Sequence, residues 1–324
     1  MKSFEERFLP VTEDCIFTED GYYVWCGSLF RHGDSYYLAY SRWKREYGFE
    51  AWVTHSEICL AKSDSPLGKM HHVRTILTAN DTGRWDSSCA HNPTVLAHNG
   101  KYYLAYMGND GPGEYWANRN RQRVGIAWCE DPEGEWHFAD KPAIDVTPGG
   151  IDDLMTSNPS LTIDGSGRAV MIYKAVQACG ILPRGKYVVC AIAFADDPAG
   201  EWTKVGKQIM VNPETGWSVE DPFIWYDGDV LRVIVKDFHG YFTGVAHSSA
   251  AMFESADGID WTLSEPAMAF GLRYLTDSGW KDVKRLERPQ LYFEDGRPTV
   301  LTCACMEQNG KDVYSVRIPL KATE

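Results

Sequence analysis

The chain has 324 residues, of which 44% are hydrophobic, and a formal charge of −13 at pH 7. It can therefore bury a substantial core, but its acidic balance repels phosphate backbones, so nucleic acid is not expected as a partner. No apolar run approaches the roughly 18 residues that span a bilayer, so no membrane partner is expected either.

The N-terminus and the cysteines bear on cellular location. The opening MKSFEERFLP is too charged for a secretory signal, and the nine cysteines form no C-x-x-C pair. We therefore expect no signal peptide, no disulfide framework, and a cytoplasmic or periplasmic location. The sequence does not indicate an oligomeric state.

Five segments share one pattern, in which a short apolar run, a Gly-containing turn and a second run rich in β-branched and aromatic residues follow one another. The segments are GSLFRHGDSYYLAYS from 27, NPTVLAHNGKYYLAYMG from 92, NPSLTIDGSGRAVMIYK from 158, DPFIWYDGDVLRVIVKD from 221 and RPQLYFEDGRPTVLTCA from 288. Each is a hairpin signature. A second hairpin follows the first four segments, and the fifth closes with VYSVRIPL.

Four strands repeated five times predict an all-β fold, a five-bladed β-propeller with four antiparallel strands per blade. Residues 1–324 then form a single domain. Its blades are expected at approximately 23–80, 81–145, 146–211, 212–270 and 271–320. The long loops at 43–55, 108–123 and 236–248 are predicted to share one face with the starts of the innermost strands, and function usually lies on such loops.

The residues just before each innermost strand should ring a pocket on the axis, because these strands converge there. The pairs are Trp25–Cys26, His91–Asn92, Ser157–Asn158, Glu220–Asp221 and Glu287–Arg288. Asp86 and Asp152 each precede an Asn-Pro pair by six residues and are expected on the same face. Carboxylates and amides bind hydroxyls, aromatic faces stack on sugar rings, and paired acids cleave acetals. The pattern therefore predicts a sugar site.

These features resemble the five-bladed glycoside hydrolases of families 32, 43, 62, 68 and 117. In family 43 an E-G-P triplet on blade 4 carries the general acid, and E-D-P here gives Glu220 that position. The family's blade 1 and blade 3 Asp-Pro pairs are replaced by Trp25-Cys26-Gly27 and Asn158-Pro159. The resemblance thus implies a divergent member with its acid in place, but not its base or its acid-tuning residue.

Three residues are predicted to be catalytic: Glu220 as the acid, and Asp86 or Asp152 as the base. Asp153 and Glu287 are rival bases, and the shared spacing of Asp86 and Asp152 also fits a structural turn. Paired acids of this kind have pKa values that diverge, so the proximity of Asp221 should raise the pKa of one member of the Glu220–Asp221 pair.

Ten residues are predicted to contact substrate: Trp25, His91, Asn92, Asp153, Asn158, Asp221, Lys236, His239, Glu287 and Arg288. For Arg288 the alternatives are an ion pair with Glu287 and a fork for a carboxylate or sulfate on the sugar. Arg119, Arg121 and Arg123, in the blade 2 loop, either add to that fork or are simply solvated.

No metal-ligand motif is present, and no cofactor is expected to be required. The resemblance adds that some related propellers hold a structural calcium or sodium ion in the channel. The predicted function is that of an exo-acting glycoside hydrolase that removes a terminal sugar from a plant or algal oligosaccharide. The alternatives are a glycoside phosphorylase and a carbohydrate-binding propeller without catalysis.

Overall fold

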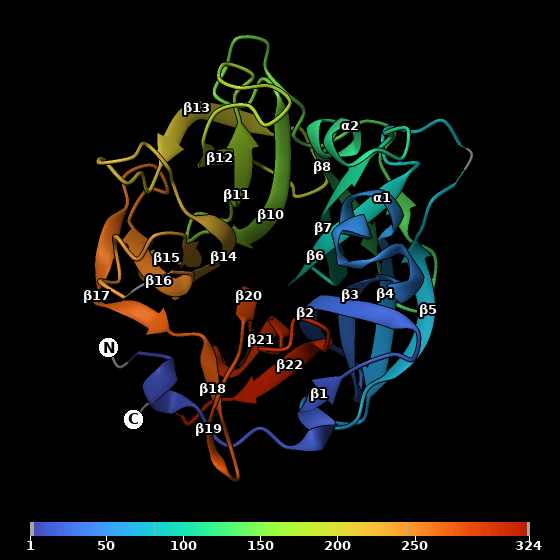
Figure 1. Cartoon of the computed structure of the whole chain (residues 1–324), viewed down its shortest axis with the longest axis vertical. Coiled ribbons are helices and arrows are strands. Elements are labelled where there is room, and N and C mark those ends of the chain that lie inside the picture. The colour runs from blue at the N-terminus through green and yellow to red at the C-terminus, as the bar shows by residue number, and fades with distance from the viewer. Residues whose placement is uncertain (1–2, 81, 246, 323–324) are drawn as a thin grey trace.

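The computed structural model describes residues 3–80, 82–245 and 247–322. Five four-stranded antiparallel sheets surround a central axis, which confirms the predicted five-bladed β-propeller (Figure 1). Within the described residues, no helix is long and apolar enough to cross a membrane.

The first four blades each use four consecutive strands. Blade 1 contains β2 (Tyr22–His32), β3 (Ser35–Lys44), β4 (Glu57–Ser63) and β5 (His71–Leu77), and blade 2 contains β6 (Cys89–His98), β7 (Lys101–Asn109), β8 (Arg123–Cys129) and β9 (His137–Phe138). Blade 3 contains β10 (Met155–Ile163), β11 (Ala169–Val176), β12 (Val188–Ala195) and β13 (Thr203–Ile209), and blade 4 contains β14 (Glu220–Tyr226), β15 (Leu231–Asp237), β16 (Ser249–Ser255) and β17 (Thr262–Phe270).

The fifth blade is completed by the N-terminal segment. It contains β20 (Arg285–Glu294), β21 (Arg297–Met306), β22 (Val313–Pro319) and, as its outermost strand, β1 (Ile16–Phe17). β1 pairs antiparallel with β22, with Ile16 opposite Val316. The two chain ends therefore lie near each other (Figure 1), and the ring is closed by strand pairing between them. A separate hairpin, β18 (Arg273–Thr276) and β19 (Gly279–Asp282), precedes this blade.

Helical turns are few and short. The two α-helices, α1 (Trp52–His55) and α2 (Tyr115–Asn120), lie in the long loops of blades 1 and 2. The 3-10 turns are η1 (Glu5–Arg7), η2 (Glu13–Cys15), η3 (Arg45–Tyr47) and η4 (Phe49–Ala51).

The hydrophobic core is divided among the interfaces between neighbouring blades. Between blades 1 and 2, for example, Leu60 of β4 and Leu104 of β7 belong to one cluster and are fully buried. Alternating apolar residues on both faces of each sheet make this packing favourable. All nine cysteines are free, and eight of them are buried. The blades thus form a rigid ring around the axis.

Candidate active site

A β-bulge occurs at the same place on the innermost strand of every blade. The register slips there, and the bulged residue has a positive φ in each case. The five residues, with φ in degrees, are Cys26 (50), Asn92 (55), Asn158 (47), Asp221 (55) and Arg288 (54). Proline follows four of them, which suits a point where the strand ladder is interrupted. The repeated E-D-P, N-P and R-P signals in the sequence mark this bulge.

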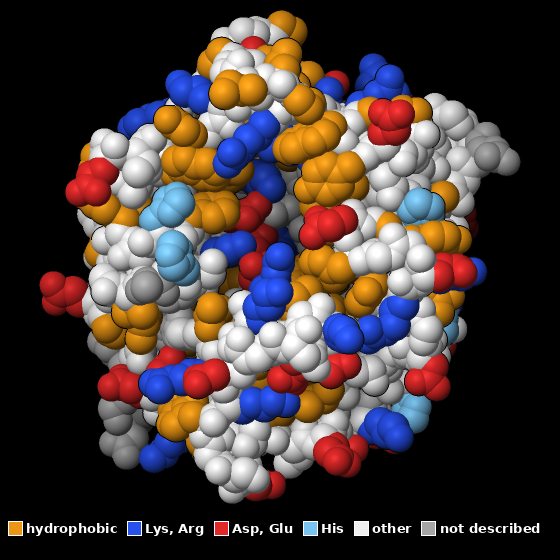
Figure 2. All heavy atoms as spheres, viewed as in Figure 1, with side chains coloured by type: hydrophobic (Ala, Val, Ile, Leu, Met, Phe, Trp, Pro, Cys, Tyr) orange, Lys and Arg blue, Asp and Glu red, His pale blue; other side chains and the backbone are white. Residues whose placement is uncertain are grey.

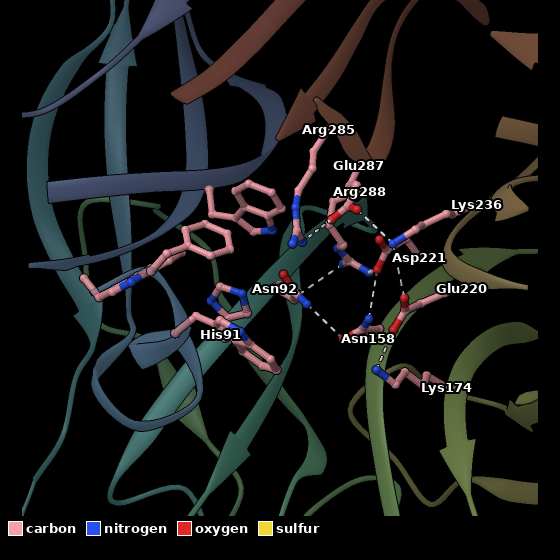
Figure 3. Close-up of a pocket in the computed structure, with 14 residues that line it drawn as sticks. His91, Asn92, Asn158, Lys174, Glu220, Asp221, Lys236, Arg285, Glu287 and Arg288 are labelled. Carbon is pink, nitrogen blue, oxygen red and sulfur yellow. Dashed lines mark hydrogen bonds and ion pairs between the residues drawn. The ribbon is translucent and has the colours of Figure 1, made fainter. Parts of the chain in front are cut away.

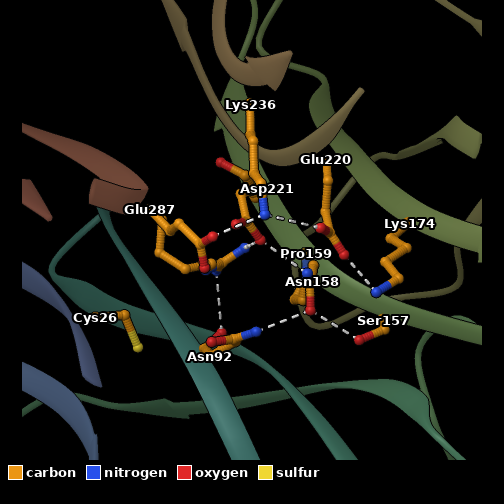
Figure 4. Close-up of polar contacts among 12 residues, drawn as sticks. Cys26, Asn92, Ser157, Asn158, Pro159, Lys174, Glu220, Asp221, Lys236 and Glu287 are labelled. Atoms are coloured by element: carbon orange, nitrogen blue, oxygen red, sulfur yellow. Dashed lines mark hydrogen bonds and ion pairs between the residues drawn. The ribbon is translucent and has the colours of Figure 1, made fainter. Parts of the chain in front are cut away.

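Four of the five bulged residues, all but Cys26, form a connected polar ring on the axis (Figure 4). Asn92 Nδ2 donates to Asn158 Oδ1 at 2.8 Å, and Asn158 Nδ2 donates to Asp221 Oδ1 at 2.9 Å. Arg288 Nη1 lies 3.7 Å from Asp221 Oδ1, and its Nη2 donates to the Asn92 carbonyl at 3.4 Å. Arg288 therefore pairs with Asp221 of the neighbouring blade, whereas the ion pair considered from the sequence was with Glu287.

Above this ring lies a cavity of about 130 Å³. It opens at the hollow near the centre of the face in Figure 2, where acidic and basic side chains lie inside a rim that is largely hydrophobic. Its lining residues are Trp25, Trp43, Phe49, Trp52, His91, Asn92, Asn158, Lys174, Glu220, Asp221, Lys236, Arg285, Glu287 and Arg288 (Figure 3).

Lysines hold Glu220 in its ionised form. Lys174 Nζ donates to Glu220 Oε1 at 2.5 Å, and Lys236 Nζ lies 3.6 Å from Oε2. Burial acts to raise the pKa of Glu220, but the two cations outweigh it and lower that pKa to about 2. Glu220 is therefore ionised in the free protein, whereas a general acid at this position has to carry a proton.

Asp221 has the raised pKa instead. Burial is the main cause and the negative charge of Glu220 the next, and together they raise the pKa of Asp221 to about 6 despite the opposing charge of Arg288. The side chain is almost fully buried but lines the cavity. The two neighbouring carboxyls therefore differ in protonation near pH 6, where Glu220 is ionised and about half of the Asp221 carboxyls carry a proton.

A third carboxylate, Glu287, faces Glu220 across a shared lysine. Lys236 Nζ donates to Glu287 Oε1 at 2.8 Å, and Arg285 Nη1 lies 3.6 Å from Oε2. Lys236 Nζ lies 2.8 Å from Glu287 Oε1 and 3.6 Å from Glu220 Oε2, so these two oxygens are separated by at most the sum of the two distances. The Glu220 and Glu287 carboxylates are therefore no farther apart than the paired carboxylates of glycosidases, which lie roughly 5–9.5 Å apart.

The blade 1 side of the cavity is aromatic. Trp25 packs edge-on against Phe49 at 5.4 Å between ring centroids, and Trp52 lies 5.3 Å from the His91 ring. His91 accepts from or donates to Ser56 Oγ at 2.8 Å, and burial keeps its pKa well below the usual value, so its imidazole is neutral. Aromatic faces next to a cluster of carboxylates are the surroundings that a sugar ring requires.

Cys26 stands where the related hydrolases carry the blade 1 Asp. Burial raises the pKa of its thiol to about 11, so it remains protonated at neutral pH and is unsuitable as a base.

The structure corrects the placement of Asp86 and Asp152, which do not line the cavity. Asp86 is fully buried and accepts hydrogen bonds from Arg84 and from Tyr106 Oη at 2.7 Å. Asp152 pairs with Lys204 Nζ at 2.8 Å. Each of these aspartates connects a linker between blades to a neighbouring strand through hydrogen bonds. These contacts fit the structural alternative considered from their shared spacing.

Two predicted substrate contacts also lie outside the cavity. Asp153 Oδ1 accepts a hydrogen bond from the Ala178 amide at 2.6 Å. His239 lies edge-on to Trp217, 5.8 Å between ring centroids. The other eight lie on the cavity wall: Trp25, His91, Asn92, Asn158, Asp221, Lys236, Glu287 and Arg288.

Sequence reasoning missed Lys174, Arg285 and the aromatic residues of the blade 1 loop. A signal for Lys174 was present, because it occupies the position in β11 that Lys236 occupies in β15. In the strand register Lys174 lies opposite Ser157 and Lys236 lies opposite Glu220. Ser157 and Glu220 each come directly before the bulged residue of their strand. Aligning the second strand of each hairpin would have identified both lysines.

The axial ring does not suit a calcium or sodium ion of the kind some related propellers hold. The Arg288 guanidinium, only 2% exposed, already lies among the oxygens of Asp221 and Asn92 and would repel a cation there. Across residues 3–80, 82–245 and 247–322, no group of three or more His, Cys, Asp or Glu side chains is arranged to hold a metal ion.

Comparison with known proteins gives one family match. Residues 28–179, which cover most of blade 1, all of blade 2 and the two inner strands of blade 3, match the model of glycosyl hydrolases family 43. The match ends before Glu220, so it does not include the axial carboxylates. A search of curated protein sequences finds no match.

Solved structures share the whole fold at low identity. One described as a glycoside hydrolase has a TM-score of 0.70 at 18% identity, covering 99% of this chain and 94% of that chain. Zg3597, a family 117 glycoside hydrolase from the marine bacterium Zobellia galactanivorans, has a TM-score of 0.66 at 16% identity, covering 97% and 89%. An endo-arabinase from Bacteroides thetaiotaomicron has a TM-score of 0.62 at 15% identity, covering 98% of each chain.

At these identities the structural neighbours show the fold alone, while the family match supports glycosidase activity. Residues 28–179 are thus similar to glycosyl hydrolases family 43, and the whole chain shares the five-bladed β-propeller fold of the glycoside hydrolases it resembles.

Proposed function

We propose that the protein is an exo-acting glycoside hydrolase that removes a terminal sugar from an oligosaccharide in the axial cavity. The observation that carries the proposal is the group of three carboxyls on the axis, one of which has a raised pKa while its neighbour has a lowered one. Environments that separate the pKa values of neighbouring acids are how glycosidases assign acid and base roles.

Asp221 is the proposed general acid. With a pKa of about 6 it retains a proton in part of the molecules near neutral pH. It gives that proton to the departing glycosidic oxygen as the bond to the anomeric carbon breaks, and the bonding electron pair leaves with the oxygen. The negative charge of the preceding residue, Glu220, raises the pKa of Asp221 because it disfavours a second negative charge nearby.

Glu287 is the proposed base. It takes a proton from the attacking water as the water oxygen bonds to the anomeric carbon. It is preferred to Glu220 because direct hydrogen bonding to Lys174, with Lys236 close by, leaves Glu220 a very weak base. Lys236 contacts both carboxylates and fixes their relative position.

The size and walls of the cavity support action on a chain end. The cavity holds about 130 Å³, and its blade 1 side is walled by Trp25, Trp43, Phe49 and Trp52. A small, walled pocket suits one terminal ring, whereas an internal position of a long chain needs an open cleft.

The test is release of a monosaccharide from a panel of plant and algal oligosaccharides, followed by chromatography. Hydrolysis should proceed by single-sugar release in wild type and should be lost in Glu287→Gln. Asp152→Asn is the matched control, because Asp152 also pairs with a lysine but lies outside the cavity. Release of internal fragments would contradict the exo assignment, and full activity of Glu287→Gln would contradict the assignment of the base.

A further inference from the structure

The axial cavity carries an excess of cationic groups in an otherwise acidic protein. Four basic side chains line it, Lys174, Lys236, Arg285 and Arg288, against three carboxyls, Glu220, Asp221 and Glu287. The whole chain has a formal charge of −13. A locally positive cavity in such a protein concentrates anions at that point of the surface.

The two lysines are already hydrogen-bonded to protein carboxylates, Lys174 to Glu220 and Lys236 to Glu287. Arg288 lies beneath them and is only 2% exposed, although its Nε and Nη1 make no hydrogen bond. The basic side chain of the cavity wall that is most open to a ligand is therefore Arg285.

The Arg285 guanidinium lies 5.3 Å from the centre of the Phe49 ring, and its Nη1 is 3.6 Å from Glu287, beyond direct hydrogen-bond distance. The side chain remains 37% exposed. Arg285 is thus held in place by stacking while its donors remain available.

Arg119 of α2 is the second arginine with donors available. Its Nη1 donates to Asn120 Oδ1 and to the Arg184 carbonyl, each at 2.9 Å, which fixes the plane of the guanidinium. Among the described residues, no carboxylate lies within ion-pair distance of it, and no hydrogen-bond partner meets its Nε or Nη2. The residue is only 9% exposed. A largely buried guanidinium without a counter-ion is costly unless a ligand supplies one.

Both arginines lie near Tyr115 of α2, and Arg285 also lines the cavity. The pKa of Tyr115 is raised by burial and by the charges of Glu50 and Glu220, while the charges of Arg119 and Arg285 act on the same hydroxyl in the opposite direction. Tyr115 also packs edge-on against Trp52, a lining residue of the cavity, at 6.2 Å. Arg285 therefore lies on the cavity wall, and Arg119 lies on the helix whose Tyr115 packs against that wall.

We infer that the terminal sugar carries an anionic group, a carboxylate or a sulfate, and that Arg119 and Arg285 receive it at the mouth of the cavity. Arginine suits this task because its planar fork binds both oxyanions through two parallel hydrogen bonds. The inference rests on the proposed function, since it names the class of sugar that the same cavity would process.

Binding of free sugars to the wild-type protein tests the inference without relying on turnover. The probes are glucuronate against glucose, galacturonate against galactose, and galactose 6-sulfate against galactose, titrated by calorimetry or NMR. At least one acidic sugar should bind more than tenfold tighter than its neutral parent, and this preference should weaken as salt is added. The uronate and sulfate probes distinguish the two anions.

Arg119→Gln and Arg285→Gln should each reduce the preference for the acidic sugar about tenfold or more, without changing the weak affinity for its neutral parent. Arg121→Gln is the matched control, because Arg121 lies beside α2, is exposed and pairs with Asp110 outside the cavity. Thermal melting of each variant confirms that the fold is retained.

Two results would overturn the inference: neutral sugars that bind as tightly as every acidic one, or turnover that requires inorganic phosphate, which would make the arginines a phosphate site. If the acidic preference holds but Asp221→Asn leaves hydrolysis unchanged, the proposed catalytic assignment fails while this inference stands.

Discussion

Replacing Glu220 by Gln should move the pH dependence of hydrolysis to lower pH. Asp221 must be protonated to act as the acid, so activity falls as pH rises through its pKa of about 6. The rise of this pKa from its ordinary value of 3.8 to about 6 corresponds to on the order of 3 kcal/mol. Burial is its largest cause and the charge of Glu220 the next. Removing that charge should lower the pKa of Asp221 by about one unit, on the order of 1.4 kcal/mol.

The loss of Glu220 also frees Lys174 and Lys236, and a freed Lys236 lowers the pKa of Asp221 in the same direction. Well above the pKa, the protonated fraction of an acid falls about tenfold for each unit by which its pKa is lowered. At neutral pH, kcat/KM of Glu220→Gln should therefore be about tenfold below wild type, and the difference should shrink toward pH 5.

The assay is the pH profile of kcat/KM, which reports the ionisations of the free enzyme. Asp152→Asn serves as the control, since Asp152 also pairs with a lysine but lies outside the cavity, and its profile should overlay that of wild type. If the alkaline limb of the kcat/KM profile of Glu220→Gln stays in place or moves to higher pH, the charge of Glu220 does not raise the pKa of the catalytic acid.

Three further changes have distinct expected outcomes. Asn158→Asp removes a hydrogen-bond donor from Asp221 and adds a like charge, so the alkaline limb of the kcat/KM profile should move up by about one unit; a downward shift would contradict the ring geometry. Trp52→Ala should raise KM roughly tenfold with little change in kcat, as expected for loss of a stacking surface; an unchanged KM would exclude Trp52 from the binding wall. Asp86→Asn should lower the free energy of unfolding by about 2 kcal/mol in denaturant titrations and leave kcat/KM unchanged. A loss of activity in the folded variant would show that Asp86 takes part in catalysis.

The repeat pattern was sufficient to predict the fold because each blade carries its own hairpin signals. The closing strand was not predictable in the same way. β1 is only two residues long, Ile16–Phe17, and lacks a turn that would join it to a neighbour in sequence. Its pairing with β22 depends on the closed ring, which brings distant segments together.

The axial residues were predicted for a related reason. The five bulges recur at one step of each innermost strand, so alignment alone brought Asn158, Asp221 and Arg288 to one place. The spacing of Asp86 and Asp152 is as regular, but their side chains turn toward strands of their own blades, where Tyr106 and Tyr173 bind them. Regular spacing locates the backbone but does not determine where a side chain on a linker points.

The division of protonation between Glu220 and Asp221 could not be predicted from the sequence. It depends on Lys174, which comes from a neighbouring blade and forms a direct hydrogen bond with Glu220. The motif E-D-P identified the pair, while only the three-dimensional contacts determine which member retains the proton.

The most direct test of the central claim is turnover by Asp221→Asn on two substrates that share a sugar but differ in leaving group. The account predicts that hydrolysis of the oligosaccharide falls by a factor of about 10² to 10⁴, because the departing oxygen is no longer protonated. An aryl glycoside whose leaving group needs no proton should lose far less. Equal rates for wild type and the folded variant on the oligosaccharide would contradict the account.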